Sequence, residues 1–173
     1  MFFEDAKLVS KELELTLTGK DCGLDERAPM CGIPYHAVDG YLNRLVSSGH
    51  KVAICEQVED PKLAKGLVKR EVIKIVTPGT NMSAQALDES KNNYIMCIVC
   101  TADKYGISIA DISTGDYLVT EVENQRKLLD EITKFSPTEI ICNQSFLVSG
   151  VDIEDLKQRF GTSIYGLEDW YFD

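Results

Sequence analysis

The sequence lacks the long hydrophobic run that a membrane-spanning helix requires. None of its 173 residues falls within an uninterrupted apolar stretch of about eighteen residues. It also lacks an export signal at its start, because Met1 is followed by the charged residues Glu4, Asp5 and Lys7 and not by a basic segment and then an apolar one. We therefore expect a chain that does not enter a membrane and that resides in the cytoplasm.

The sequence also lacks the cysteine spacing typical of a disulfide-bonded framework, although six cysteines are present. Cys97 and Cys100 form a C-x-x-C pair within an expected strand, where residues three apart point to opposite faces and cannot share a metal ion. His36 and His50 have no Asp or Glu at the spacing of a metalloprotease. We expect no metal site, and we interpret all six cysteines as reduced, buried thiols. They are Cys22, Cys31, Cys55, Cys97, Cys100 and Cys142.

The motifs of nucleotide binding are absent from the sequence. Neither G-x-x-x-x-G-K-[ST] nor G-x-G-x-x-G occurs, so we expect no ATP site in this chain. No grouping of Ser, His and Asp or of Cys and His suggests an activated nucleophile. We therefore expect a chain that is not an enzyme and that holds no cofactor.

Positive charge is scarce in the second half of the chain. Hydrophobic residues make up 44% and charged residues 27% of the sequence, an ordinary globular composition with a net charge of −10. Residues 1–80 hold 11 Lys and Arg against 12 Asp and Glu, whereas residues 81–173 hold 7 against 16. Binding to phosphate requires Lys and Arg, so any nucleic-acid contact is expected in the first half. The acidic second half suits a basic protein partner.

Hydrophobic spacing predicts a mixture of helices and strands in the first half. A helix opens the chain and changes to strand periodicity near Leu13, where Leu13, Leu15 and Leu17 alternate with polar residues. Two loops are expected next, a polar one over 19–27 and an irregular one over 28–34 that is rich in Pro and Gly. The remaining predicted elements are a helix over 39–49, a strand over 51–57, a short helix over 61–65 and a strand over 72–76.

The second half predicts the element order βββαβαβ. The turn-forming residues of 77–80 are followed by a polar stretch, which we interpret as a linker. The predicted organisation is a first domain over residues 1–80, a linker over 81–91 and a second domain over 92–173. Expected strands of the second domain cover 94–101, 106–113, 117–121, 140–142 and 163–165, and expected helices cover 123–135 and 153–160.

Three stretches of the first half resemble the mismatch-binding domain of the MutS family of DNA mismatch-recognition proteins. They read FFEDAKLVSKELELTLTGKD, ERAPMCGIPYHAVDGYLNRLVSSGHKVAICEQVEDP and AKGLVKREVIKIVTPGT. The second half, most clearly YGISIADISTGDYLV, resembles the connector domain of that family. The resemblance implies an α/β fold, with a mixed-sheet mismatch-binding domain followed by an RNase H-like connector that is incomplete at its C-terminal end.

The resemblance also implies how the chain contacts mismatched DNA. In this family a Phe-x-Glu motif reads the mismatch, with the ring wedged into the weakened base stack. That motif is expected before Met1, and Phe2-Phe3-Glu4 fits its pattern but belongs in register to the following helix. The remaining implied contacts flank the mismatch or touch phosphates, and they position the duplex without reading its sequence. They are Met30, Pro34, Tyr35 and His36 in one loop, and the basic residues Lys20, Lys69 and Arg70. Without the resemblance, the loop residues would be interpreted as loop core and the basic residues as solvated.

The family also implies partners beyond this chain. They are double-stranded DNA with mismatches or small insertion loops, the protein MutL, and a second subunit in a homodimer of the longer protein. ATP and Mg belong to an ATPase region further along that longer protein. In the family a preceding segment adds a strand to the first sheet, so we expect unpaired backbone edges and self-association here.

Two alternative functions stay open at this point. The chain could be mainly a protein-interaction module that docks MutL and binds little DNA. It could also be a nuclease, because RNase H-like nucleases hold divalent metals with an Asp in the position of Asp111. Two-metal chemistry needs several carboxylates around ions about 4 Å apart. However, Asp116 flanks the turn that is expected after Asp111, and Glu131, Glu154 and Asp155 lie on expected helices. Charged residues on helices are usually exposed to solvent, so these carboxylates are not expected to converge on metal ions.

Overall fold

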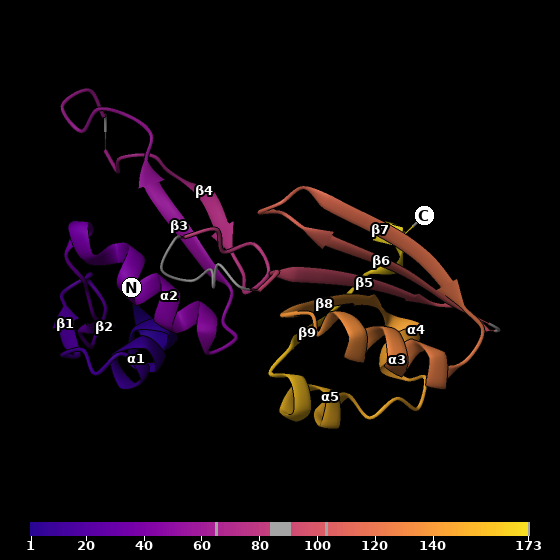
Figure 1. Cartoon of the computed structure of the whole chain (residues 1–173). Coiled ribbons are helices and arrows are strands. Elements are labelled where there is room, and N and C mark those ends of the chain that lie inside the picture. Colours follow the sequence, from indigo (N-terminus) through magenta and orange to yellow (C-terminus); the bar gives the residue numbers. More distant parts are fainter. Residues whose placement is uncertain (65, 84–90, 103, 173) are drawn as a thin grey trace. The chain divides into compact units, whose positions relative to one another are not determined.

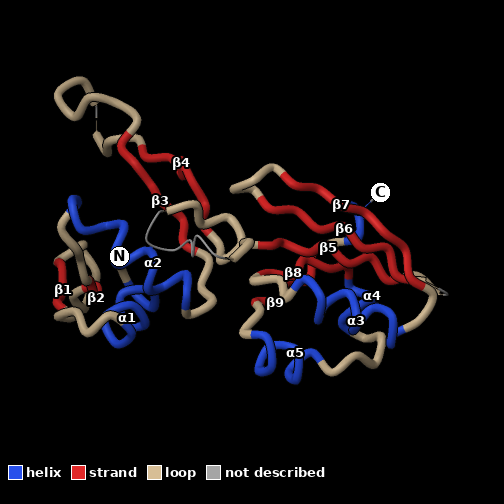
Figure 2. The backbone as a smooth tube through the Cα atoms, in the orientation of Figure 1, coloured by secondary structure: helices blue, strands red, loops and turns tan. Residues whose placement is uncertain are grey.

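The chain folds into two compact units, Met1–Val76 and Thr77–Asp173. The computed structural model describes residues 1–64, 66–83, 91–102 and 104–172. Both units combine helices with strands (Figures 1 and 2), so the predicted α/β class is confirmed. Within the described ranges, no helix has the length and apolar character needed to span a membrane.

The first unit is built around helix α1 (Phe3–Glu12), which opens it. Ala6 and Val9 recur at helical spacing and are buried, and Glu4 and Asp5 place negative charge in the first turn, where the helix dipole favours it. These two apolar residues pack with Leu13, Cys31 and Leu45. The other elements of the unit are β1 (Thr18–Lys20), β2 (Ala28–Met30), the 3-10 turn η1 (Tyr35–Ala37), α2 (Val38–Ser47), β3 (Val52–Gln57) and β4 (Arg70–Val76).

The early strands of the first unit differ from prediction. Leu13 ends α1 and is buried, and the chain then turns through Glu14 at a φ of 56°, so no strand forms over 13–17. The strand appears instead as β1, which pairs with β2 in the segment that was predicted to be irregular. Pro29 of β2 is compatible with this pairing because a two-stranded sheet leaves each strand an open edge, where a missing N–H group costs nothing.

The second sheet of the first unit is an antiparallel pair, β3 and β4. We call this pair the ribbon. Its register joins Val52 to Val76 and Gln57 to Arg70, with a bulge on the β4 side at Ile73. The predicted helix over 61–65 is wrong for the described part, which is a turn at 61–63, and residue 65 lies outside the described residues. In that turn the Asp60 carbonyl accepts from the Leu63 amide at 2.9 Å, and so short a segment cannot offset the cost of helix nucleation.

The second unit contains one five-stranded sheet in the order β7-β6-β5-β8-β9. The antiparallel β5, β6 and β7 follow one another along the chain, while β8 and β9 run parallel to β5. The predicted order βββαβαβ is present, with the short α4 and η2 added. The elements are β5 (Tyr94–Cys100), β6 (Tyr105–Asp111), β7 (Asp116–Val122), α3 (Gln125–Phe135), β8 (Glu139–Asn143), α4 (Gln144–Leu147), α5 (Ile153–Phe160), β9 (Ser163–Leu167) and η2 (Asp169–Phe172).

Helices α3 and α5 lie on the same side of this sheet (Figure 1). Both begin at side-chain caps: Asn124 accepts from the Lys127 amide, and Asp152 accepts from the Asp155 amide. Alternate residues of the central strand face these helices, which is why β5 alternates between buried and half-buried positions. The fully buried side chains of this core include Met96, Ile98, Leu128, Ile132, Ile140, Cys142 and Phe146.

The segment Thr77–Thr80 belongs to the second unit in the structure. The Gly79 amide donates to the buried Glu139 carboxylate at 3.0 Å, and the Asn93 side chain donates to the Pro78 carbonyl at 3.1 Å. The compact units therefore divide after Val76, at the point where β4 ends. Residues 84–90 of the predicted linker lie outside the described residues.

Candidate nucleic-acid interface

The loop that begins at Met30 is fixed to the start of the chain. The charged amino group of Met1 donates to the Cys31 carbonyl at 2.9 Å, and the Cys31 amide donates to the Met1 carbonyl at 3.2 Å. Phe2 also forms an isolated β-bridge with Met30. Cys31 is buried and Met30 is half-buried, so the first residues of the loop contribute to packing as well as to its surface.

The following residues of this loop form an exposed corner before α2. Pro34 has a φ of −62° and its carbonyl accepts from the Ala37 amide at 3.0 Å, which closes the turn η1. Tyr35 is 83% exposed and His36 is also exposed. An aromatic ring with so much accessible surface does not belong to a loop core. The interpretation of Tyr35 as part of a loop core is therefore wrong. The same interpretation of Met30, which is half-buried, holds in part.

Lys20 lies near this loop. It ends β1, pairs with Ala28 in the first sheet, and places its Nζ atom 6.0 Å from the centre of the Phe2 ring. Since Phe2 bridges to Met30, the structure brings the exposed ammonium group of Lys20 to the neighbourhood of the loop. This arrangement places a cation, which can contact phosphate, near the aromatic ring of Phe2 at the start of the loop.

Arg70 is the first residue of β4 in the ribbon, and Lys69 directly precedes it. The Nζ atom of Lys69 is 2.6 Å from a carboxylate oxygen of Glu71, and its amide donates to Glu59. Arg70 is exposed and pairs with Gln57 across the ribbon. The predicted basic residues are therefore divided between the first sheet, which holds Lys20, and the start of β4, and the positive charge of Lys69 is shared with the carboxylate of Glu71.

The Phe2-Phe3-Glu4 segment does not present a reader motif. Phe3 and Glu4 lie in the first turn of α1, as the register of the resemblance predicts. The carboxylate of Glu4 is paired with Lys7 at 2.7 Å, one helical turn further on. Its acceptor oxygens are thus directed along the helix surface.

Asp111 shapes the turn between β6 and β7. Its carboxylate accepts from the amide and hydroxyl of Ser113 at 2.8 and 2.6 Å and from the Asn93 amide at 3.1 Å. Burial raises the pKa of this carboxyl group, but the hydrogen bonds from Ser113 and Asn93 outweigh it and hold the pKa below its usual value. No group of three potential metal-ligating residues converges anywhere in the described parts of the chain. The geometry around Asp111 therefore favours a structural role over the nuclease interpretation.

The cysteines fall into two classes. Cys97 and Cys100 lie on opposite faces of β5, as predicted, and burial raises the pKa of both thiols. Burial also raises the pKa of Cys142 to about 11. However, Cys22 and Cys55 are exposed, which corrects the expectation that all six are buried. Cys22 lies in a loop, and Cys55 points to the open side of the ribbon.

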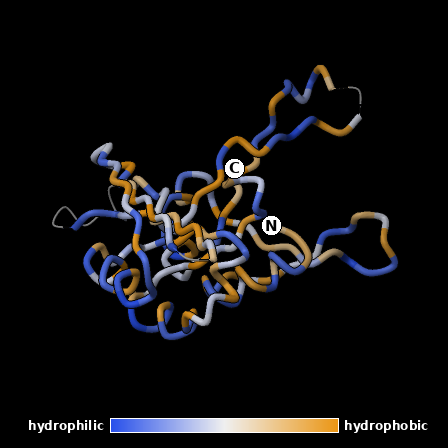
Figure 3. Tube along the Cα trace, turned by 90° about the vertical axis from the view of Figure 1, so that its right-hand side faces the viewer, coloured by the Kyte–Doolittle hydropathy of each residue, from blue (hydrophilic) through white to orange (hydrophobic). Residues whose placement is uncertain are grey.

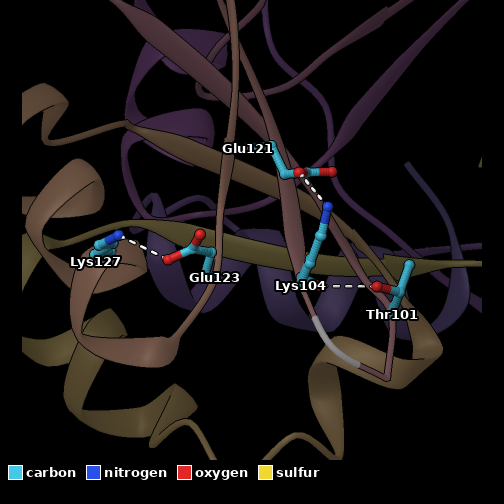
Figure 4. Close-up of polar contacts among 5 residues, drawn as sticks. All are labelled: Thr101, Lys104, Glu121, Glu123 and Lys127. Carbon is cyan, nitrogen blue, oxygen red and sulfur yellow. Dashed lines mark hydrogen bonds and ion pairs between the residues drawn. The ribbon is translucent and has the colours of Figure 1, made fainter.

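A polar cluster that the sequence did not reveal lies at one end of β6 and β7 (Figure 4). Lys104 contacts Glu121 at 2.7 Å and Lys127 contacts Glu123 at 3.0 Å, while the Thr101 hydroxyl donates to the Lys104 carbonyl. The hydrogen bond and charge of Glu121 raise the pKa of Lys104, and those of Lys127 lower the pKa of Glu123. All four charges are exposed, so the pairs contribute little to stability.

Most lysines of the second unit are neutralised in this way. Two further ion pairs join Lys134 to Glu131 and Lys157 to Glu154 along helices α3 and α5. Four of the seven basic residues of 81–173 therefore already have carboxylate partners. This unit is a poor surface for phosphate.

Comparisons with known proteins cover the whole chain. A family model described as MutS domain I matches residues 1–85, and one described as MutS domain II matches residues 93–173. The chain is 65% identical over 173 residues to the DNA mismatch repair protein MutS of Lachnoclostridium phytofermentans, a match that covers 100% of this chain and 19% of that protein.

Other relatives of the same name give a similar result. The MutS protein of Acetivibrio thermocellus is 56% identical over 176 residues, covering 100% of this chain and 20% of that protein. That of Clostridium tetani is 53% identical over 173 residues, covering 99% and 19%. The chain thus spans about a fifth of the length of the curated relatives it matches.

Proposed function

Because the chain belongs to the MutS family of DNA mismatch repair proteins, we propose that its first unit helps to position mismatched duplex DNA within a longer protein of this family. The observation that carries the proposal is the exposed corner of Pro34, Tyr35 and His36. It continues the loop that starts at Met30, whose bridge partner Phe2 lies near the ammonium group of Lys20. The ligand is duplex DNA with a mismatch or a small insertion loop. Such a duplex bends at low cost, so shallow contacts beside the defect suffice to hold it.

The strength of this contact follows from the charges that make it. Lys20, Lys69 and Arg70 supply about three phosphate contacts, and each contributes about −0.9 to the slope of log affinity against log salt. Raising the salt from 50 to 200 mM should then weaken binding about 40-fold. If Lys69 stays paired with Glu71, two contacts remain and the loss is about 12-fold.

Mismatch preference is not expected from this chain by itself. The only Phe-x-Glu sequence at its start is part of α1 or adjoins it, and Glu4 is held by Lys7. Without a ring free to wedge between bases, the contacts position the duplex but do not read it.

We propose a different role for the second unit, which is to dock a protein partner such as MutL and to relay DNA capture to the rest of the longer protein. Its net charge of −9 over residues 81–173 and its paired lysines make it complementary to a partner protein with a basic surface, which supports this proposal. ATP and Mg act in other regions of that longer protein, as does its assembly into a homodimer. In this proposal the chain is cytoplasmic, carries no cofactor and catalyses no reaction.

Fluorescence anisotropy tests the DNA contact directly. The chain is titrated into a labelled homoduplex and a G·T duplex at 50 and 200 mM salt. We expect weak binding that is equal for the two duplexes and falls by one order of magnitude or more between the two salt concentrations. Lys20→Ala and Tyr35→Ala should each weaken it several-fold, while Lys134→Ala, which removes an exposed lysine of the second unit, should not. Unchanged binding by both first-unit variants would refute the proposed interface.

A further inference from the structure

Two arginines of the second unit differ from its lysines because they have no carboxylate partner. Four lysines of the unit form ion pairs with Glu side chains, whereas Arg126 and Arg159 form none within the described part of the chain. Both arginines are exposed, and both line one groove of about 530 Å³. A unit with a net charge of −9 over residues 81–173 therefore places two unneutralised cations in the same groove.

Helix α3 provides most of this groove, which we call the arginine groove. Arg159 of α5 completes it, and the α3 residues recur at the three- and four-residue spacing of one helical face. Leu129 is half-buried against the core of the unit, so it adds apolar surface between polar side chains. Figure 3 shows this mixture of hydrophilic and hydrophobic residues along the helical coils. The α3 residues of the groove are Gln125, Arg126, Leu129, Asp130 and Thr133.

The position of each arginine makes its charge available to an anion. Arg126 lies in the first turn of α3, a turn without acidic residues, where the unpaired amides of the helix already favour negative charge. Arg159 lies in the last turn of α5, and its guanidinium carbon is 5.1 Å from the centre of the Phe160 ring. Such a ring contact orients the guanidinium group and leaves its charge in place. The groove has a net charge of +1, because Asp130 is the one carboxylate among its described lining residues.

We propose that the arginine groove docks an acidic segment of a partner protein. One guanidinium group can donate two parallel hydrogen bonds to a carboxylate, so the segment places one carboxylate on Arg126, another on Arg159 and an apolar side chain on Leu129. Duplex DNA fits less well, because its many phosphates would meet the negative charge of the whole unit, whereas a short segment brings few charges to one point. This contact is distinct from the basic partner surface proposed for the same unit and does not depend on it.

A short synthetic peptide tests the proposal on the full chain. The probe has four glutamates and two leucines between terminal glycines, and the control probe has glutamine in place of each glutamate. In ¹H–¹⁵N NMR spectra at 50 mM salt, the glutamate probe should shift the side-chain Nε–H signals of Arg126 and Arg159 and the backbone amide signals of 125–133. Two exposed charge pairs and one apolar contact predict a Kd on the order of 1 mM. The glutamine probe should bind about fivefold more weakly, or weaker still.

Substitutions in the groove distinguish a specific contact from a general charge effect. Arg126→Gln and Arg159→Gln should each weaken binding of the glutamate probe about threefold. Lys134→Gln is the matched control, because it removes the same charge from α3 outside the groove, and it should change binding by less than about 1.5-fold. Asp130→Asn should strengthen binding about twofold, since it removes the repelling carboxylate. A gain in affinity cannot result from a loss of structure.

Circular dichroism of each variant checks that the helices remain intact, and the other substitutions decide the question if one variant does not fold. The proposal is overturned if the glutamate probe shifts neither arginine signal at 5 mM, or if the two probes bind equally. It is equally overturned if Lys134→Gln weakens binding as much as Arg126→Gln, if Asp130→Asn weakens binding, or if duplex DNA shifts both arginine signals at a lower concentration than the probe. Failure of a basic partner to bind this unit would leave the NMR result unchanged, so the two proposals fail separately.

Discussion

Replacing Asp111 with Asn should destabilise the second unit although the two side chains have nearly the same shape. Asp111 is 1% exposed, and its carboxylate accepts three hydrogen bonds, two from Ser113 and one from the Asn93 amide. An amide side chain has one acceptor oxygen, so its NH₂ group would face a donor. Leaving one buried donor unsatisfied costs about 1–3 kcal/mol, and losing a charged acceptor adds to this. We expect a loss of about 2–4 kcal/mol in the free energy of unfolding.

Urea unfolding measures this loss. The chain has one tryptophan, Trp170, which lies in the second unit, so its fluorescence together with circular dichroism follows that unit. Asp116→Asn is the matched control, because Asp116 ends the same turn but is exposed, and it should cost less than about 1 kcal/mol. Equal effects of the two substitutions would show that the hydrogen bonds of Asp111 are not what stabilises the turn.

The pH dependence supplies a second check on the same residue. The folded pKa of Asp111 lies below its unfolded value. Its contribution is therefore complete above the unfolded pKa, near 3.9, and is lost as pH falls through the folded pKa. The difference in stability between the wild type and Asp111→Asn should be constant above about pH 5 and shrink only in stronger acid. A difference that grows on acidification would contradict this assignment.

Two further predictions concern buried positions. Gly79→Ala should lower the unfolding free energy of the second unit by about 1–3 kcal/mol, because a methyl group there would overlap the Ile95 side chain. Gly32→Ala is the control, because a methyl group there meets open space, and it should leave the midpoint of thermal unfolding unchanged. Equal decreases in the unfolding midpoint for the two variants would show that overlap with Ile95 is not the cause. Cys142, whose pKa burial raises to about 11, should resist iodoacetamide at pH 8 while the exposed Cys22 reacts, as peptide mass spectrometry would show. Equal alkylation rates in the folded protein would contradict the burial of Cys142.

Periodicity in the sequence predicted the second unit better than the first. The alternation in 94–100 and 105–111 is long, and its apolar positions face one core, so strand type and order were both readable. Short elements carry no comparable signal, which is why α4 was missed. That helix depends on the Asn143 side chain, which accepts from the Phe146 amide. The helix therefore depends on one capping hydrogen bond and leaves no hydrophobic periodicity in the sequence.

The first unit shows where local patterns become ambiguous. Leu13 fits both the helical spacing before it and the alternation after it. In the structure it caps α1 and is buried in the same core as Ala6 and Val9 of that helix, so the helical spacing gave the correct prediction. The exposure of Tyr35 follows from a turn and could not be obtained from periodicity. Cys55 was interpreted as buried because it lies in an apolar run, but only one face of β3 is covered.

Partners distant in sequence were not predictable at all. The Asn93 amide that donates to the Asp111 carboxylate lies just before β5, whereas Asp111 ends β6. The Glu139 carboxylate that accepts from the Gly79 amide lies 60 residues further along the chain. Both contacts depend on strand register, which a single sequence does not specify.

Strand β5 joins two kinds of pairing, and this has a consequence for the order in which the second unit acquires its structure. Strand β6 pairs with β5, and β7 pairs with β6, and both follow β5 closely along the chain, so we expect these antiparallel pairs to form early. Pairing with β8 brings together Ile98 and Cys142, 44 residues apart, and must wait for α3 to cross over. We therefore expect a folding stage in which the edge of β5 that pairs with β8 is unpaired, until α3 and β8 have formed.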